Sequence, residues 1–238
     1  MISCIVPAKN EAGHLRHVIG EIKQIKEISE IVIVEGGSID NTLFEARKLA
    51  FENPSLIKVA VQNGKGKFNA VRLGAELCQE SLILIWDADG TVPLDSTQSI
   101  VSIALSSGSP VIGNRLRGKI ETGAMFKANY LGNWFFAILW APMMKGRVVD
   151  LLCGTKIFTK SVYLSIPEKI AARDPYGDFS LLIAARILGE DVISIPVRYE
   201  KRKYGETNIH RWTGGLKLLW VTILAHLIFL KVNLNLRG

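Results

Sequence analysis

The chain has 238 residues, of which 48% are hydrophobic and 21% charged, and this composition excludes disorder as its dominant state. Its net charge is +7, and eight basic but only two acidic residues fall within Arg198–Gly238. A charge excess at one end argues against a nucleic-acid-binding protein and favours an anionic partner met by the C-terminal segment. The three cysteines are widely spaced and form no disulfide framework or zinc motif.

Short runs rich in Ile and Val alternate with segments of helical periodicity through the first half of the chain. The strand-like runs are Ser3–Val6, Ile31–Val34, Ile57–Val61, Leu82–Trp86 and Val111–Gly113. Because several of them lack polar alternation, we expect strands buried on both faces, in a mostly parallel sheet covered by helices. The order predicts an α/β fold with ligands at the carboxyl ends of the strands.

The second half of the chain has a different pattern. Gly123–Met144 predicts an apolar helix, Asp178–Leu188 another helix and Val192–Val197 a strand. Leu218–Leu230 is a run without formal charge that would span about 20 Å as a helix, which is less than the ~30 Å of a bilayer core. We therefore expect this helix either to lie in the headgroup zone of a membrane or to pack as a core or dimer helix.

Polar motifs follow four of the predicted strands. Asp87 and Asp89 come directly after an apolar strand, and such a pair suits a divalent cation that also binds a diphosphate. Pro7–Glu11, Glu35–Thr42 and Gly64–Lys67 follow three other strands. Each motif alone also suits a turn, a helix cap or a solvated basic loop. Their shared position at one edge of the sheet predicts a binding site there.

Seven motifs in order resemble those of the family 2 glycosyltransferases with a GT-A fold. More narrowly, they are similar to the polyprenyl-phosphate hexosyltransferases related to dolichol-phosphate mannose synthase. The resemblance covers Ile2 to about Ile209 and is carried by Pro7–Glu11, Glu35–Thr42, Lys65–Ala70, Asp87–Asp89, Val111–Arg115, Asp150–Lys156 and Pro196–Thr207. The chain departs from the family at three positions. Gly36 replaces a second acidic residue, Asp178 is the sole obvious carboxylate at the start of its helix, and Thr207 replaces a serine.

The resemblance implies a GT-A, Rossmann-like domain over residues 1–209, with a mostly parallel sheet flanked by helices. An apolar, basic-flanked segment over residues 210–238 would associate with a membrane. The implied activity is inverting transfer of a hexose from a GDP- or UDP-linked sugar to a dolichyl or undecaprenyl phosphate. The chain shows no signal-peptide pattern after Met1, so we expect the cytoplasmic face of the membrane, with peripheral attachment or a short C-terminal anchor.

The resemblance also implies roles for individual residues. Asp87 and Asp89 would bind Mg²⁺ or Mn²⁺, which neutralises the leaving diphosphate. The expected nucleotide-binding residues are Pro7, Ala8, Asn10, Glu11, Glu35, Lys67, Asp87 and Ala88. The expected catalytic residues are Asp89, Asp178, Arg117 and Arg202.

The chemistry of the phosphate acceptor determines whether the catalytic residues have to include a base. The two arginines are candidates for binding its phosphate, because guanidinium groups match phosphate geometry. Asp178 is either a base or a ligand of a sugar hydroxyl, and it also suits a structural position at a helix N-terminus. A lipid phosphate is already ionised at neutral pH, so positioning matters more than a strong base.

Two other functions fit the same motifs. A glycosyltransferase acting on a saccharide or other soluble acceptor would need a base of raised pKa, and its C-terminal helix would be part of the core. A non-catalytic nucleotide-sugar-binding protein of this fold is the second, since a fold does not fix a function. The intact pair of Asp87 and Asp89 argues against the second alternative.

Overall fold

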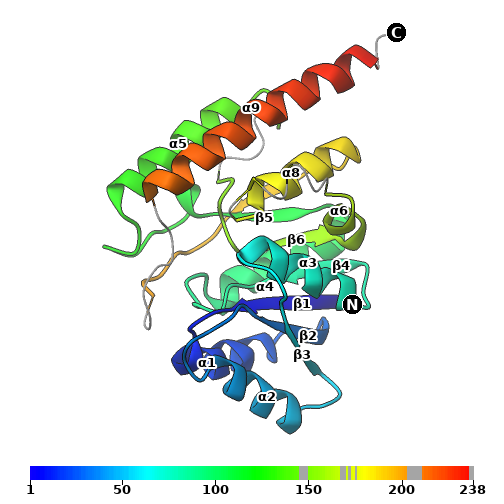
Figure 1. Ribbon diagram of the computed structural model, residues 1–238, viewed down its shortest axis with the longest axis vertical. Helices are drawn as coiled ribbons and strands as arrows, with labels where there is room; N and C mark the ends of the chain where they lie inside the picture. Colours follow the sequence, from blue (N-terminus) through cyan, green and yellow to red (C-terminus); the bar gives the residue numbers. More distant parts are fainter. Residues whose placement is uncertain (145–149, 167–169, 171–172, 175, 203–210, 236–238) are drawn as a thin grey trace.

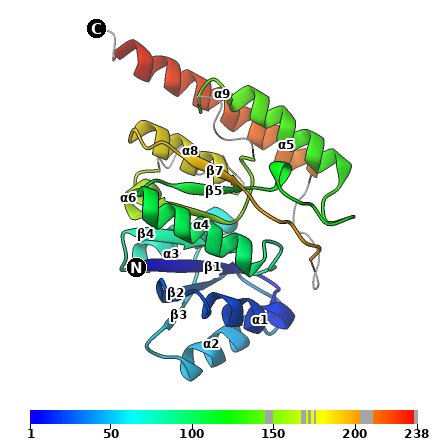
Figure 2. The ribbon, with the colours of Figure 1, turned by 180° about the vertical axis from the view of Figure 1, so that it is seen from behind.

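The computed structural model describes residues 1–144, 150–166, 170, 173–174, 176–202 and 211–235, and the side chains of the last segment from residue 214 to 230. Within these residues, one sheet has the strand order β3-β2-β1-β4-β6-β5-β7. Helices cover both faces of the sheet: Figure 1 looks onto the side with α3, and Figure 2 onto the side with α4. The predicted α/β architecture is confirmed.

Most strands are parallel and deeply buried, as their unbroken apolar sequences predict. Four of them, β1–β4, form a continuous parallel block, and β5 pairs in parallel with β7. The strands are β1 (Ile2–Ala8), β2 (Ile28–Glu35), β3 (Ile57–Val61), β4 (Leu82–Ile85), β5 (Val111–Asn114), β6 (Lys156–Thr159) and β7 (Ile193–Pro196).

Strand β6 lies antiparallel between β4 and β5 and is not among the strands predicted from the sequence. The strand has four residues and begins with a lysine, so it shows neither a long apolar run nor alternation. Its insertion brings the segment Asp150–Thr155 to the carboxyl end of β4. The arrangement of the site therefore depends on a strand that the hydrophobic pattern of the sequence does not predict.

The helices before residue 120 connect the parallel strands and bury one apolar face each. In the first of them, Leu15, Val18, Ile19 and Ile22 are buried at helical spacing, which explains why this segment forms an amphipathic helix. The helices are α1 (Ala12–Ile22), α2 (Thr42–Glu52), α3 (Lys67–Leu77) and α4 (Leu94–Ser107), followed by the short helix η1 (Arg115–Arg117). Further along come α6 (Lys160–Leu164) and α8 (Asp178–Ile187).

Helices α5 (Lys127–Trp140) and α9 (Arg211–Asn235) lie side by side at one end of the molecule, beyond α8 (Figures 1 and 2). One face of α9 is buried through Leu218, Val221, Thr222, Ala225 and Phe229. The indole Nε1 of Trp140 donates a hydrogen bond of 3.0 Å to Oγ1 of Thr222. The C-terminal helix thus packs on the rest of the chain.

The opposite face of α9 leaves apolar side chains exposed, at Leu216, Trp220, Ile223, Leu227 and Leu230. On α5, Leu131, Phe135 and Ile138 are exposed in the same way. Among the described residues, no helix combines the length and hydropathy needed to cross a bilayer. The predicted domain boundary at residues 209 and 210 and the predicted motif at Thr207 lie outside the described residues.

The Trp140–Thr222 hydrogen bond predicts how the C-terminal helix contributes to stability. Thr222→Val keeps the shape of the side chain but leaves the buried indole N–H without its acceptor, so we expect a loss of about 1–3 kcal/mol in the free energy of unfolding. Urea denaturation followed by fluorescence measures this loss. Thr222→Ser, which keeps the hydroxyl, is the control, and equal stability of the Val variant and the native chain would contradict the prediction.

Candidate functional site

The candidate site lies where β1, β2 and β4 end. The strands are parallel, with Ala8 level with Glu35 and Ile5 level with Ile85, so the residues that follow them emerge at one edge of the sheet. Carboxyl ends of neighbouring parallel strands are where open α/β sheets bind ligands. The structure therefore brings three of the predicted motifs to a common edge.

The loops after β1 and β2 are joined by side-chain hydrogen bonds. Asn10 adopts a left-handed backbone with φ of 57°, and its Oδ1 accepts a bond of 2.9 Å from the backbone N of Ile39. The backbone N of Asn10 donates to Oγ of Ser38 at 3.0 Å, and the backbone N of Glu11 donates to Oγ1 of Thr42 at 2.8 Å. Asn10 thus connects the two loops, which is a structural use of a residue predicted to bind nucleotide.

Glu35 is buried, and its carboxylate forms hydrogen bonds within the loop that follows β2. Its carboxylate accepts hydrogen bonds from Ser38 and from the backbone of Gly37. Burial alone would raise the pKa of Glu35, but these hydrogen bonds outweigh it and hold the pKa below its usual value. The carboxylate is therefore ionised at neutral pH and fixes the shape of the loop beside Pro7 and Ala8.

Asp87 points toward α3 and is packed tightly. Its Oδ1 forms an ion pair with Nζ of Lys67, the first residue of α3. Burial raises the pKa of Asp87, while Lys67 and then Lys156 lower it, with a net decrease. A Cβ atom at Gly154 would lie 1.7 Å from Oδ2 of Asp87, so a larger residue at that position would require the Asp87 side chain to move.

Asp89 is held on both sides. Its Oδ1 accepts hydrogen bonds from the backbone N and the hydroxyl of Thr91, at 3.2 and 3.0 Å. Its Oδ2 lies 2.8 Å from Nη2 of Arg202. The other terminal nitrogen of Arg202, Nη1, lies 3.0 Å from Oε1 of Glu11, so this guanidinium bridges two carboxylates from distant parts of the chain.

Glu11 is 7% exposed, and its Oε2 is buried without a hydrogen-bond partner among the described residues. Its pKa is raised to about 7, first by burial and then by Asp89, although the charge of Arg202 works in the opposite direction. The site thus gathers three carboxylates, Glu11, Asp87 and Asp89, against two cations, Lys67 and Arg202. The cluster therefore carries one excess negative charge when Glu11 is ionised, and this charge favours the binding of a cation.

The carboxylates of the site suit a hard divalent cation when a bound diphosphate supplies the remaining ligands. Among the described residues, no group of three or more acidic, histidine or cysteine side chains is arranged to hold a metal by itself. Two adjacent carboxylates do suit Mg²⁺ or Mn²⁺ when a bound diphosphate supplies further oxygen ligands. Asp87 and Asp89 are therefore the residues that would hold such a cation, and Lys67 and Arg202 would need to turn from them to the phosphates.

Asp178 is the buried first residue of α8, and it forms an ion pair with Nζ of Lys156, the first residue of β6. The charge of Asp178 also acts on Lys67, so the two ion pairs are neighbours. The sequence pattern predicts a functional role for Asp178 but gives none to Lys156. No sequence signal identified Lys156, because the four-residue strand that it begins shows no periodic pattern.

A second buried ion pair was also missed. Asp150 is fully buried and accepts three hydrogen bonds from Arg115, from the backbone N at 3.0 Å, Nε at 2.6 Å and Nη2 at 2.9 Å. The guanidinium of Arg115 also lies 5.1 Å from the centre of the Tyr199 ring. The pair fixes the loop that precedes β6 to the end of β5. Both residues lie in quoted motifs, but their pairing needs the fold.

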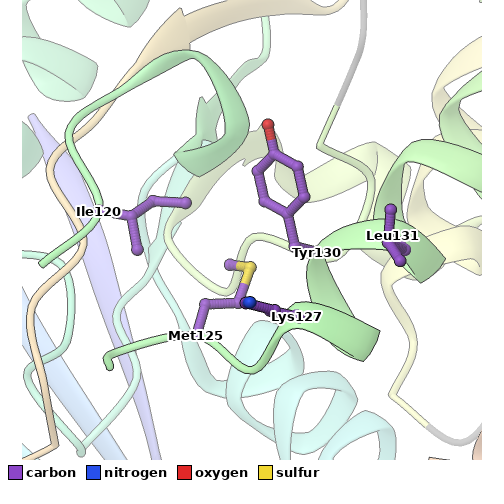
Figure 3. Close-up of a pocket in the computed structure, with 5 residues that line it drawn as sticks. All are labelled: Ile120, Met125, Lys127, Tyr130 and Leu131. Carbon is purple, nitrogen blue, oxygen red and sulfur yellow. The ribbon is translucent and has the colours of Figure 1, made fainter. Parts of the chain in front are cut away.

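Arg117 is exposed in η1, apart from the ion pairs of the carboxylate cluster, and its backbone N donates to Oδ1 of Asn114 at 3.1 Å. Beyond it, a shallow cavity of about 400 Å³ is lined by Ile120, Met125, Lys127, Tyr130 and Leu131 (Figure 3). Four of these five lining residues are apolar or aromatic, and the ammonium group of Lys127 is the charge among them. Arg117 and Arg202, predicted to act on one phosphate, thus have different surroundings.

The bridge made by Arg202 predicts the order in which ligands bind. Arg202→Met removes a cation that competes for Asp89 and Glu11, so we expect Mn²⁺ alone to bind several-fold more tightly than to the native chain. We expect the same variant to bind a nucleoside diphosphate, probed with UDP, more weakly in the presence of Mn²⁺, because the guanidinium would no longer be present to bind the diphosphate.

Electron paramagnetic resonance of free Mn²⁺ and calorimetry of UDP binding measure the two effects. Arg198→Met, which breaks an exposed pair of 2.8 Å with Asp95, is the matched control and should change neither affinity. Weaker binding of Mn²⁺ alone to the Arg202 variant would contradict the prediction.

The chain is similar in sequence to curated proteins that are named for transfer to dolichyl phosphate. A dolichyl-phosphate β-glucosyltransferase of Trichomonas vaginalis is 26% identical over 83% of this chain and 63% of its own length. A UDP-N-acetylglucosamine–dolichyl-phosphate N-acetylglucosaminyltransferase of Methanococcus voltae is 25% identical over 98% of this chain and 97% of its own. The chain spans just under two thirds of the Trichomonas relative.

Solved structures share the fold at low sequence identity. Glucosyl-3-phosphoglycerate synthase of Mycobacterium tuberculosis, in complex with UDP, superposes with a TM-score of 0.70 at 16% identity, covering 94% of this chain and 79% of that one. Mannosyl-3-phosphoglycerate synthase of Rubrobacter xylanophilus gives 0.70 at 18% identity, covering 98% and 75%. The GT-A fold is thus confirmed. The model of glycosyl transferase family 2 matches residues 3–164, and the chain belongs to that family.

Proposed function

We propose that the protein transfers a hexose from a UDP-linked sugar to a polyprenyl phosphate at a membrane surface. The carboxylate pair of Asp87 and Asp89 at the strand ends, bordered by Lys67 and Arg202, is the observation that carries the proposal. Relatives named for transfer to dolichyl phosphate support the acceptor class. The Methanococcus relative, which matches over nearly the whole chain, is named for a UDP-linked donor and supports the choice of UDP.

One group of site residues binds the nucleotide-sugar donor. Asp87 and Asp89 hold Mg²⁺ or Mn²⁺, which when bound neutralises charge on the leaving diphosphate. Lys67 and Arg202 turn from these carboxylates to the diphosphate oxygens. Pro7, Ala8 and the loop fixed by Glu35 line the nucleoside.

The bond change needs little proton transfer. An ionised oxygen of the acceptor phosphate attacks the anomeric carbon while the bond to the diphosphate breaks, and the configuration inverts. Since the nucleophile carries no proton at neutral pH, the site has to position the reactants rather than supply a strong base. Asp178, paired with Lys156, then serves as a ligand of a sugar hydroxyl.

The acceptor approaches from the side of α5. The cavity near Ile120, Tyr130 and Leu131 offers apolar surface to the first isoprene units, and Lys127 offers a cation to the phosphate (Figure 3). Arg117 precedes this segment in the chain and is exposed, so it is available to the same phosphate. A groove of apolar residues with a cation matches an amphiphile with an anionic end.

Helices α5 and α9 supply the membrane contact. Their exposed apolar side chains, Leu131, Phe135 and Ile138 on one helix and Leu216, Trp220, Ile223, Leu227 and Leu230 on the other, suit burial at the boundary of headgroups and acyl chains. The charge excess after Arg198 favours an anionic surface, such as the cytoplasmic leaflet. The acceptor and the protein would then meet in one plane.

The transfer proposal predicts the effect of a change at the metal pair. Asp89→Asn removes a charged ligand for the cation, so we expect product formation to fall by about two orders of magnitude or more, with the fold retained. Incubation with UDP-[¹⁴C]hexoses, Mn²⁺ and polyprenyl phosphate, followed by organic extraction, measures the product. Asp95→Asn, in an exposed pair, is the control. Transfer to water-soluble acceptors instead of the lipid would refute the acceptor assignment.

The proposed membrane contact predicts the effect of replacing exposed apolar residues of α9 by polar ones. Replacing Trp220, Ile223 and Leu227 by serine removes exposed apolar surface without touching the buried face, so we expect binding to phosphatidylglycerol vesicles to fall at least tenfold. Vesicle flotation measures binding. The triple serine variant of Ile39, Phe44 and Phe51, exposed on and beside α2 at the other end of the molecule, is the control. Equal flotation of both variants would contradict the proposal that the exposed face of α9 binds the membrane.

A further inference from the structure

Lys156 is a charged residue at the centre of the sheet. It begins β6, is 1% exposed and pairs in register with Ile85 of β4 and Ile112 of β5. Ile85 is the last residue of β4 and is followed by Trp86 and then by Asp87. Lys156 therefore lies level with the end of β4 from which the metal motif emerges. The charge of Lys156 contributes to the low pKa of Asp87, although its ion pair is with Asp178.

Stability alone does not explain a lysine in this place. Moving two charges out of water costs several kcal/mol, and buried ion pairs can often be replaced by apolar residues without loss of stability. The neighbours of Lys156 in β6, Ile157 and Phe158, are fully buried apolar residues, so an apolar side chain would suit the same strand. What the pair provides is a carboxylate of fixed charge and orientation at the first residue of α8.

The surroundings of Asp178 show what depends on this lysine. Among the described residues, Asp178 interacts electrostatically with Lys156 from β6, Lys67 from α3, Tyr163 from α6, and Asp174 and Tyr176 before α8. Lys67 is already paired with Asp87. Without Lys156, the Asp178 carboxylate would be buried beside Asp174, and no other cation in the described part of the chain is paired with it.

Asp174 has hydrogen-bond partners of its own at the start of α8. Asp174 is 3% exposed and accepts hydrogen bonds from the backbone N and the hydroxyl of Ser180, at 2.8 and 2.9 Å, and from the backbone N of Tyr176 at 3.1 Å. The pKa of Asp174 is raised, first by burial and then by the charge of Asp178. The start of α8 is thus fixed by its own hydrogen bonds, and the cation for Asp178 comes from β6.

We propose that Lys156 is a positioning residue, which holds the Asp178 carboxylate in place to accept a hydrogen bond from a hydroxyl of the donor hexose. This inference rests on the proposed function, because it needs a hexose bound between the metal pair and α8. Lys156 acts through Asp178 and touches no substrate itself. It therefore affects recognition of the sugar and leaves recognition of the nucleotide unchanged.

Binding of UDP and of UDP-hexose to the same variants tests the inference. We take the ratio of the two dissociation constants, measured by calorimetry with Mn²⁺ for UDP-glucose or UDP-N-acetylglucosamine, whichever the native chain binds more tightly. Lys156→Met and Asp178→Asn should each weaken UDP-hexose by roughly ten- to a hundredfold relative to UDP, as expected for a hydrogen bond to a charged group. Lys156→Arg should restore most of the difference.

The pH dependence separates positioning from a merely structural role. In Lys156→Met, burial without a cation favours the protonated form of the carboxyl group, so the variant's affinity for UDP-hexose should increase relative to UDP as the pH rises. Asp178→Asn, which cannot ionise, should show no such increase. Lys58→Met is the matched control, because it breaks a pair of 2.8 Å with Glu30 away from the site and should leave the ratio unchanged.

Each outcome is decisive. An unchanged ratio in folded Lys156→Met, or a loss that affects UDP and UDP-hexose equally and ignores pH, overturns the inference and leaves the proposed function intact. A native chain that binds neither ligand overturns the proposed function and the inference with it. If the Met variant fails to fold by circular dichroism, Lys156→Gln, which keeps a hydrogen-bond donor but no charge, takes its place with the same expected ratio.

Discussion

The pairing of acidic side chains with internal cations is the constraint on which the site depends. Parallel strands force Glu11, Asp87 and Asp89 to one edge of the sheet, where their mutual repulsion would be costly at low dielectric. Lys67 and Arg202 offset that cost, one from the helix after β3 and the other from the segment after β7. The cations that stabilise the folded chain are thus also the groups placed to receive a diphosphate. The stability of the chain without ligand and its affinity for ligand therefore depend on the same five charged side chains.

The C-terminal half joins this site to the other end of the molecule. Arg202 bridges two carboxylates of the N-terminal half, and α9 follows it in the chain and packs against α5 and α8. Helix α8 in turn begins with Asp178. Helix α9 therefore has two environments, one buried face that depends on Thr222 and Trp140 and one exposed apolar face. A helix with both faces apolar but only one covered is typical of a protein that completes its packing on another surface.

Much of the fold and part of the site could be predicted from the sequence. The parallel strands were recognisable because unbroken runs of Ile and Val are buried on both faces, and strand ends then located Asp87 and Asp89. Strand β6 was not recognisable, because four residues beginning with Lys156 carry no periodic signal. The ion-pair partners were beyond reach for the same reason: Arg115 with Asp150, and Arg202 with Glu11, are far apart in sequence and meet only through the antiparallel insertion and the last strand. The roles given to Asn10 and Glu35 illustrate a further difficulty, since their polar groups join loops as well as bordering the site.

The contact between Gly154 and Asp87 has a consequence for how this site can change. Any side chain at that position would occupy the space of a carboxylate oxygen, so the loop before β6 and the turn after β4 can vary only in concert. Mutational drift in the two segments is therefore coupled, although they are remote along the polypeptide. Attempts to graft a different cation preference onto this scaffold would have to redesign both segments as one unit.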